Sequence, residues 1–232
     1  REEIESHGAY SCVSLEDAAH KAVALSKGNP VLDYTGFTQT KNEIDALVER
    51  ESLKFDSEQK YIRALYTGGT LADEAMKLLD KEGYAMYSNI PLSQDYRLKD
   101  ISKSEKNTCI DLGDDDFTVG RPHPMIDPMG RVERLPEEAH DGEVAIILMD
   151  FVIGYGCHVD PAGEMLPQII EAKKNARSRG KYLCVVGYVC GTEADPQNFK
   201  EQKEKLEKAG VIVMPSNAQA VRFCAKLMKK LN

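Results

Sequence analysis

Short apolar runs alternate with amphipathic stretches from about residue 61 onward, and this alternation constrains the fold more than any other feature. It is typical of a parallel sheet covered by helices on both faces. The five predicted strands are 61–66, 109–112, 144–149, 182–186 and 211–213, with an edge strand at 84–88. The predicted helices are 70–79, about 126–140, 162–178, 196–209 and 216–230. We therefore expect an α/β domain with three layers and a doubly wound, mostly parallel sheet.

The first 57 residues show a different pattern. Ser14 is a predicted N-cap for a helix that runs to about residue 27, and residues 42–53 form a second predicted helix. The segment is too short and too charged to hold a core of its own. We expect a helical arm that docks on the domain or connects it to a missing preceding domain. The chain also starts abruptly at Arg1, which suggests a fragment of a longer protein.

The overall charge limits the classes of partner. A net charge of -8 and a pI near 5.3 describe an acidic surface that repels nucleic acid and anionic lipid. The six cysteines lack CxxC spacing, which favours reduced thiols in the cytoplasm. No apolar stretch approaches the roughly 20 residues that cross a bilayer. We expect a cytoplasmic protein that binds neither nucleic acid nor membranes.

Ligands of doubly wound sheets bind beyond the carboxyl ends of the strands. The predicted loops at that edge are 67–69, 113–128, 150–161 and 187–196. In the first loop, Gly68 and Gly69 allow a ligand to approach the backbone, and the next helix offers unpaired N–H groups to an anion. The alternative is a tight turn with Thr70 as the N-cap. No Walker lysine follows the glycines.

The second loop carries three consecutive aspartates after Gly113. Asp114, Asp115 and Asp116 repel one another unless solvent, a cation or an arginine offsets their charge. Arg121 is the obvious partner, and Mg²⁺ is the alternative because hard cations prefer oxygen ligands. A solvated acidic turn explains the residues equally well, and the sequence leaves the choice open.

Two histidines follow predicted strands. His123 lies between two prolines, which stiffen the backbone around it. Its imidazole could act as a general acid or base, contact a phosphate, or form a purely structural hydrogen bond. His158 follows the third strand, where Gly156 suggests backbone lying against a ligand. The neighbouring Cys157 is a weak candidate nucleophile, because adjacent side chains usually point in different directions.

The loop after the fourth strand contains Thr192 and Glu193, which we expect to face the same cleft. Asp195 and Pro196 are explained as the N-cap and first residue of the next helix. A phosphoacceptor receiver domain also has five strands and acidic residues such as Asp150. That alternative is disfavoured because no lysine follows the fifth strand.

Three motifs together resemble the FdrA family, whose members are similar to the alpha subunit of succinyl-CoA synthetase. The motifs are Ala64-Leu65-Tyr66-Thr67-Gly68-Gly69-Thr70-Leu71, the run from Asp111 to Pro128, and Gly154-Tyr155-Gly156-x-His158-x-Asp160-Pro161-Ala162. The resemblance covers about residues 58–232. It implies a CoA-ligase-type, flavodoxin-like domain, normally preceded by a Rossmann-like CoA-binding domain. Residues 1–57 would then be the connector from that domain.

The chain departs from the synthetase pattern in one respect. The alpha subunit carries its phosphorylated histidine in a glycine-rich insertion after the fourth strand, whereas this sequence has no histidine after His158. The resemblance implies a fragment of an acyl-CoA synthetase that lacks the phosphohistidine loop. The alternatives are a subunit of an oxamate carbamoyltransferase-type complex in allantoin catabolism, or a non-catalytic binding or assembly module.

We expect one cleft at the carboxyl edge of the sheet. His123, Arg121 and His158 are the predicted catalytic residues, with Arg121 pairing bidentately with a carboxylate or phosphate and His123 orienting or protonating the reacting group. The predicted anion- and substrate-binding residues are Gly68, Gly69, Thr70, Gly113, Asp114, Asp115, Gly156 and Thr192.

The expected ligand is a small carboxylate, phosphate, acyl or carbamoyl compound. The candidate cofactors are Mg²⁺ and, in the full-length protein, CoA. Further enzyme subunits or a homo-oligomer are the expected protein partners. We expect the isolated fragment to be inactive because the first domain and the partner subunits are missing.

Overall fold

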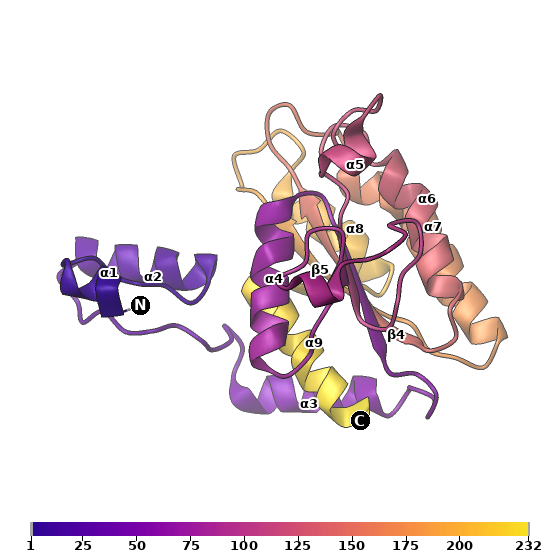
Figure 1. The fold of residues 1–232 in the computed structure, drawn as a ribbon, viewed down its shortest axis with the longest axis horizontal. Helices are drawn as coiled ribbons and strands as arrows, with labels where there is room; N and C mark the ends of the chain where they lie inside the picture. Colours follow the sequence, from indigo (N-terminus) through magenta and orange to yellow (C-terminus); the bar gives the residue numbers. More distant parts are fainter. Residues whose placement is uncertain (1, 232) are drawn as a thin grey trace.

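The computed structural model describes residues 2–231 and contains a six-stranded sheet in the order β2-β3-β1-β4-β5-β6 (Figure 1). All neighbouring strands pair in parallel. The strands are β1 (Tyr61–Tyr66), β2 (Tyr87–Ser88), β3 (Thr108–Asp111), β4 (Val144–Val152), β5 (Cys184–Cys190) and β6 (Ile212–Met214). The predicted three-layer α/β fold is confirmed, and β2 is the predicted edge strand.

Helices cover both faces of the sheet. The helices are α1 (Glu2–Ser6), α2 (Leu15–Ser26), α3 (Lys41–Ser52), α4 (Gly69–Lys81), α5 (Asp115–Thr118), α6 (Met129–His140), α7 (Pro161–Ser178), α8 (Phe199–Lys208) and α9 (Asn217–Leu231), with a 3-10 turn at Gln94–Tyr96. Apolar residues of α3, α4 and α9 pack on one face, and those of α6, α7 and α8 pack on the other.

The strands read as continuous apolar runs because both faces of the sheet are buried. In β4, Leu148 packs toward α4 and α9, whereas Ile147 and Met149 pack toward α6 and α7. All three are fully buried. Alternate residues of each strand therefore enter two separate cores, which fixes the register of the central strands.

Two strands extend beyond their predicted ends. The loop expected at 187–196 begins only after Cys190, because Gly187 is a strand residue. A Cβ at Gly187 would lie 3.1 Å from Phe151 Cε2 and 3.2 Å from Val211 Cγ1, so the glycine permits close packing rather than a turn. Similarly, β4 continues through Asp150 to Val152.

Two helix starts differ from the expectation. Gly68, not Thr70, is the N-cap of α4, and it makes no side-chain capping bond. Helix α8 begins at Phe199 with Asn198 as its N-cap. Asp195 instead accepts the amide N–H of Thr192 at 2.5 Å, which closes a turn before the helix.

The N-terminal arm contains the two predicted helices. The Ser14 side chain accepts the Asp17 amide, as predicted for the N-cap of α2. Helices α1 and α2 lie to one side of the sheet (Figure 1), where the Leu15 amide donates to Glu74 of α4. In contrast, α3 is part of the main packing, because its Ile44 is buried in the core shared with α4 and α9.

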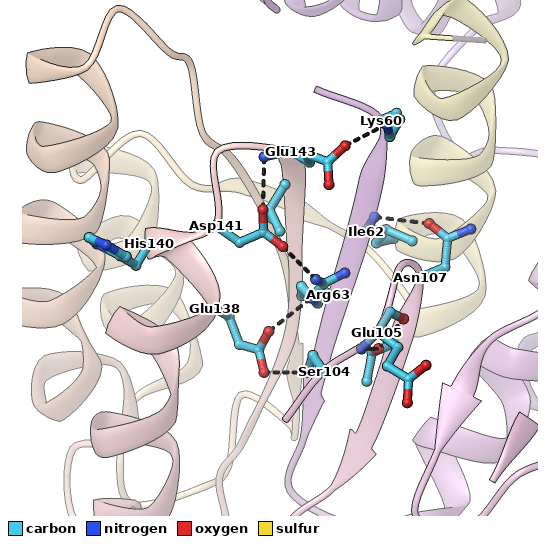
Figure 2. Close-up of polar contacts among 12 residues, drawn as sticks. Lys60, Ile62, Arg63, Ser104, Glu105, Asn107, Glu138, His140, Asp141 and Glu143 are labelled. Atoms are coloured by element: carbon cyan, nitrogen blue, oxygen red, sulfur yellow. Dashed lines mark hydrogen bonds and ion pairs between the residues drawn. The ribbon is translucent and has the colours of Figure 1, made fainter. Parts of the chain in front are cut away.

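A buried ionic network lies on the α6 side of β1 (Figure 2). Arg63 Nε donates to Glu138 Oε2 at 2.9 Å, and its Nη2 donates to Asp141 at 2.8 Å. Glu138 Oε1 accepts Arg134 Nε and the Ser104 hydroxyl, each at 2.5 Å. Two arginines therefore share the buried Glu138 carboxylate, Asp141 supplies the second negative charge, and the network joins β1, α6 and the segment before β3.

All six cysteines are free thiols. Burial raises the pKa of Cys184 to about 12 and also raises the pKa of Cys157. A thiolate at Cys157 is therefore disfavoured, consistent with its weak standing as a nucleophile. Among residues 2–231, no helix has the length and apolar character that crossing a membrane requires.

Candidate functional site

The switch point of the sheet lies between β1 and β4. These strands are neighbours, but β1 leads into α4 on one face and β4 leads into α7 on the other. Such a divergence opens a crevice at the carboxyl edge. A cavity of about 310 Å³ lies there, lined by Thr67, Gly68, Gly69, Thr70, Leu71, His123, Met125, Asp150 and Val152.

The N-terminus of α4 forms one wall of this cavity. The first N–H groups of a helix have no partner within it, and the first turn of α4 contains no acidic residue. A Cβ at Gly69 would lie 2.9 Å from Asp111 Oδ2, so glycine is needed for the close approach of α4 to β3. The resulting wall of backbone donors is suited to an anionic group.

His123 lies beside Gly68 and Gly113. Its Cε1 is 4.0 Å from the position of a Cβ at Gly68, and its Nε2 is 2.5 Å from that of a Cβ at Gly113. The Met125 amide donates to Nδ1 at 3.2 Å, so a neutral ring carries its proton on Nε2. The ring therefore borders the N-terminus of α4 through Cε1 and places its Nε2 donor beside Gly113.

Asp111, at the end of β3, lies beside Gly113 together with the His123 ring. Its Oδ1 accepts the Gly113 amide at 2.9 Å, and Asn89 binds both backbone groups of Asp111. Burial raises the pKa of this carboxyl, an effect that the charge of Asp114 reinforces and that of His123 opposes. The Asp111 carboxyl and the His123 ring therefore lie beside the same glycine, with Asp111 Oδ1 3.2 Å and His123 Nε2 2.5 Å from the position of a Cβ at Gly113.

A buried ion pair supports the floor of the cavity. Asp150 Oδ1 accepts both the Thr67 amide and the Thr67 hydroxyl at 2.8 Å. Arg131 donates to the Thr67 hydroxyl at 3.0 Å and approaches Asp150 Oδ1 at 3.4 Å. Burial lowers the pKa of Arg131, whereas the charge of Asp150 raises it. These contacts join the ends of β1 and β4 at the start of the glycine loop.

The structure places Arg121 outside this cavity. Its side chain is exposed and pairs with Glu133 of α6 at 3.0 Å. It borders a different cavity of about 330 Å³, beside Phe117 and Pro122. Gly120 has a φ of +77°, and this left-handed turn directs the chain outward just before Arg121. The expectation that Arg121 and His123 share one cleft is therefore wrong.

The backbone of His158 contacts the loop that carries His123, but its side chain does not. Its amide donates to the Met125 carbonyl at 2.8 Å, but its Nδ1 accepts the Asp160 amide in the turn before α7. Gly156 is exposed, with a φ of +83°. Thr192 lies in the exposed turn closed by Asp195. None of the three lines the cavity at the switch point.

The aspartates after β3 have structural partners. Asp114 caps α5 by accepting the Asp116 amide at 3.1 Å, and Asp115 is exposed in the first turn. Among the described residues, no three His, Cys, Asp or Glu side chains are grouped to hold a metal. These aspartates therefore do not form a set of ligands that would hold Mg²⁺ at this loop.

Three supporting residues of the site were not predicted from the sequence. They are Asp111 and the buried pair of Arg131 and Asp150. Asp111 ends β3 and Asp150 lies two residues before the end of β4, and a charge near the carboxyl end of a buried parallel strand is a recognisable pattern. Arg131 carries no such pattern, because arginine in an amphipathic helix usually faces solvent.

Comparison with known proteins relates the chain to one family and to a curated relative. The model of the CoA-ligase family matches residues 65–227. The chain is also 42% identical over 219 residues to the protein of Escherichia coli (strain K12) named "Uncharacterized protein YahF". That alignment covers 92% of this chain and 41% of the relative, so the chain spans about two fifths of the relative's length.

Proposed function

Because this chain belongs to the CoA-ligase family, we propose that it is the domain of an acyl-CoA ligase-like protein that binds the anionic end of the reacting group. The observation that carries this proposal is that the His123 ring and the glycine-capped N-terminus of α4 line one cavity, with His123 Cε1 4.0 Å from the position of a Cβ at Gly68. A carboxylate or phosphate there would accept hydrogen bonds from the helix amides and from the imidazole.

The residues of the cavity have distinct roles in this proposal. The amides that begin α4 hold two oxygens of the anion, and His123 donates to a third or stabilises charge that develops during transfer. Asp150 and Arg131 fix the position of Thr67 and so act as positioning residues.

We further propose that the whole protein is FdrA-like. The motifs at the carboxyl edge support this, and the segment before α3 serves as the connector to a preceding CoA-binding domain, since α3 itself packs in the core. Under this proposal CoA binds outside the cavity described here, and catalysis requires other parts of the protein or further subunits. The small share of the relative's length that the chain covers agrees with this arrangement.

Carbamoyl transfer of the oxamate type, as in allantoin catabolism, is the second candidate. The stretch after β5 contains no histidine, so a phosphohistidine step has no residue to act on in that loop. Transfer of a carbamoyl group to or from phosphate requires anion binding and charge stabilisation rather than a protein nucleophile. The cavity at the switch point supplies both.

Replacing His123 with alanine tests the proposed site. Isothermal titration calorimetry of the chain with phosphate, succinate, oxamate and carbamoyl phosphate, each with and without CoA, should detect an anion that binds the wild type. His123→Ala should weaken that binding by about 10- to 100-fold, as expected for loss of one charge-assisted hydrogen bond.

Arg121→Ala is the matched control, because it removes a cation from the neighbouring cavity and should leave the affinity unchanged. Equal affinities of wild type and His123→Ala would contradict the proposal, as would no binding of any anion. Preference for succinate favours acyl-CoA chemistry. Preference for carbamoyl phosphate or oxamate favours the second candidate.

A further inference from the structure

A third cavity lies at the amino end of the sheet, opposite the site described above. Its volume is about 520 Å³, and residues from the C-terminal ends of α3, α7 and α8 line it together with the residues that precede β5 and β6. Its cations are Arg50, Lys54, Lys173 and Arg177. Its carboxylates are Glu51 and Glu207, so positive charge is in excess.

Lys173 is the buried cation of this amino-end cavity. Its relative exposure is 9%, and its ammonium donates to the Gly210 carbonyl at 2.5 Å. An ammonium has three donors, and within residues 2–231 that carbonyl is the sole hydrogen-bond acceptor of this one. Burial lowers the pKa of Lys173, and the charge of Arg177 lowers it further.

The two carboxylates do not neutralise these groups. Glu51 is buried and already accepts from Arg50, Lys54 and the Tyr182 hydroxyl. Glu207 is half exposed and lies 3.7 Å from Lys203. In the part of the chain that the structure describes, neither Lys173 nor Arg177 has a carboxylate within ion-pair distance.

Helix dipoles explain part of this charge, because cations near helix C-termini are stabilising. Arg50 and Arg177 lie in the last turns of α3 and α7 and fit that explanation. It does not account for the unused donors of the buried Lys173 ammonium. Gly210 has a φ of +74°, and a Cβ there would lie 3.1 Å from Lys173 Nζ. The absence of a side chain at this position keeps the ammonium accessible from the cavity.

We propose that the amino-end cavity binds a small molecule that carries a phosphate or pyrophosphate group, at a site separate from the carboxyl edge of the sheet. The Arg177 guanidinium suits bidentate contact with two phosphate oxygens, and Lys173 supplies a buried point charge with free donors. Lys54 adds a third cation at the rim. The volume is within the range of pockets that bind nucleotide-sized ligands.

Calorimetry with pyrophosphate tests this proposal in a His123→Ala background, which isolates the amino-end cavity from the proposed site at the carboxyl edge. Pyrophosphate should bind this variant, and adding Arg177→Gln or Lys173→Met should each weaken binding by about tenfold or more. Because Arg177 is exposed, its replacement leaves folding intact even if Lys173→Met does not.

Lys174→Gln is the matched control, since this exposed lysine of α7 does not line the cavity. It should retain the affinity of the background variant. The proposal is overturned if pyrophosphate does not bind, if Arg177→Gln and folded Lys173→Met bind it unchanged, or if succinate binds there in preference to pyrophosphate. These outcomes are independent of whether His123 binds an anion.

Discussion

Asp150→Asn is expected to destabilise the protein by about 3–5 kcal/mol, because it leaves the Arg131 guanidinium buried without a counter-charge. The two side chains are 1% and 2% exposed, so water cannot replace the lost interaction. The asparagine keeps the shape of the side chain and one acceptor for Thr67, which isolates the effect of charge. For a chain of this size, the midpoint of thermal unfolding should fall by roughly 6–20 °C.

Chemical denaturation of wild type and variant measures this free energy of unfolding. Asp73→Asn on α4 is the matched control, because Asp73 forms an exposed pair with Lys77 and should contribute no more than about 0.5 kcal/mol. A loss below about 1 kcal/mol in Asp150→Asn would show that the pair does not hold the ends of β1 and β4 together.

Glu138→Gln should destabilise the protein by a similar amount, again about 3–5 kcal/mol, because it removes the carboxylate that binds Arg63 (Figure 2) and also Arg134. The side-chain NH₂ of the glutamine would also face the N–H donor of Arg63 or Arg134, where the carboxylate oxygen was an acceptor. Arg63 Nη1 already lacks a partner among the described residues, so the network has no spare acceptor to compensate.

Glu133→Gln provides the comparison on the same helix. Glu133 pairs with Arg121 at the surface, where each side chain is more than half exposed, and its replacement should change stability by less than about 1 kcal/mol. If urea denaturation gave equal losses for the two variants, the buried network would not be the main link between β1 and α6.

The sheet was predictable because its strands are buried on both faces and therefore read as apolar runs between turn residues. The ends of the strands were less predictable. Gly187 reads as a turn in the sequence, but it allows close packing against Phe151. Asp150 reads as a loop residue, but Arg131 pairs with it inside the core. Both errors concern contacts between segments that are distant along the chain.

The candidate site was predictable in the same limited sense. The glycine pair and His123 follow strands that are neighbours in the sheet, so the topology brings them together. Arg121 is two residues from His123 but lies in another cavity, because the left-handed turn at Gly120 and the ion pair with Glu133 direct it outward. Side-chain direction within a loop depends on such local geometry, which spacing does not encode.

The most direct test of the anion site is a phosphate titration followed by NMR of the backbone amides. The amides of Gly69, Thr70 and Leu71 should shift together with the His123 ring resonances, and all should report one dissociation constant. The proposed site would be contradicted if these amides stayed fixed at saturating phosphate, whether or not resonances elsewhere in the chain moved.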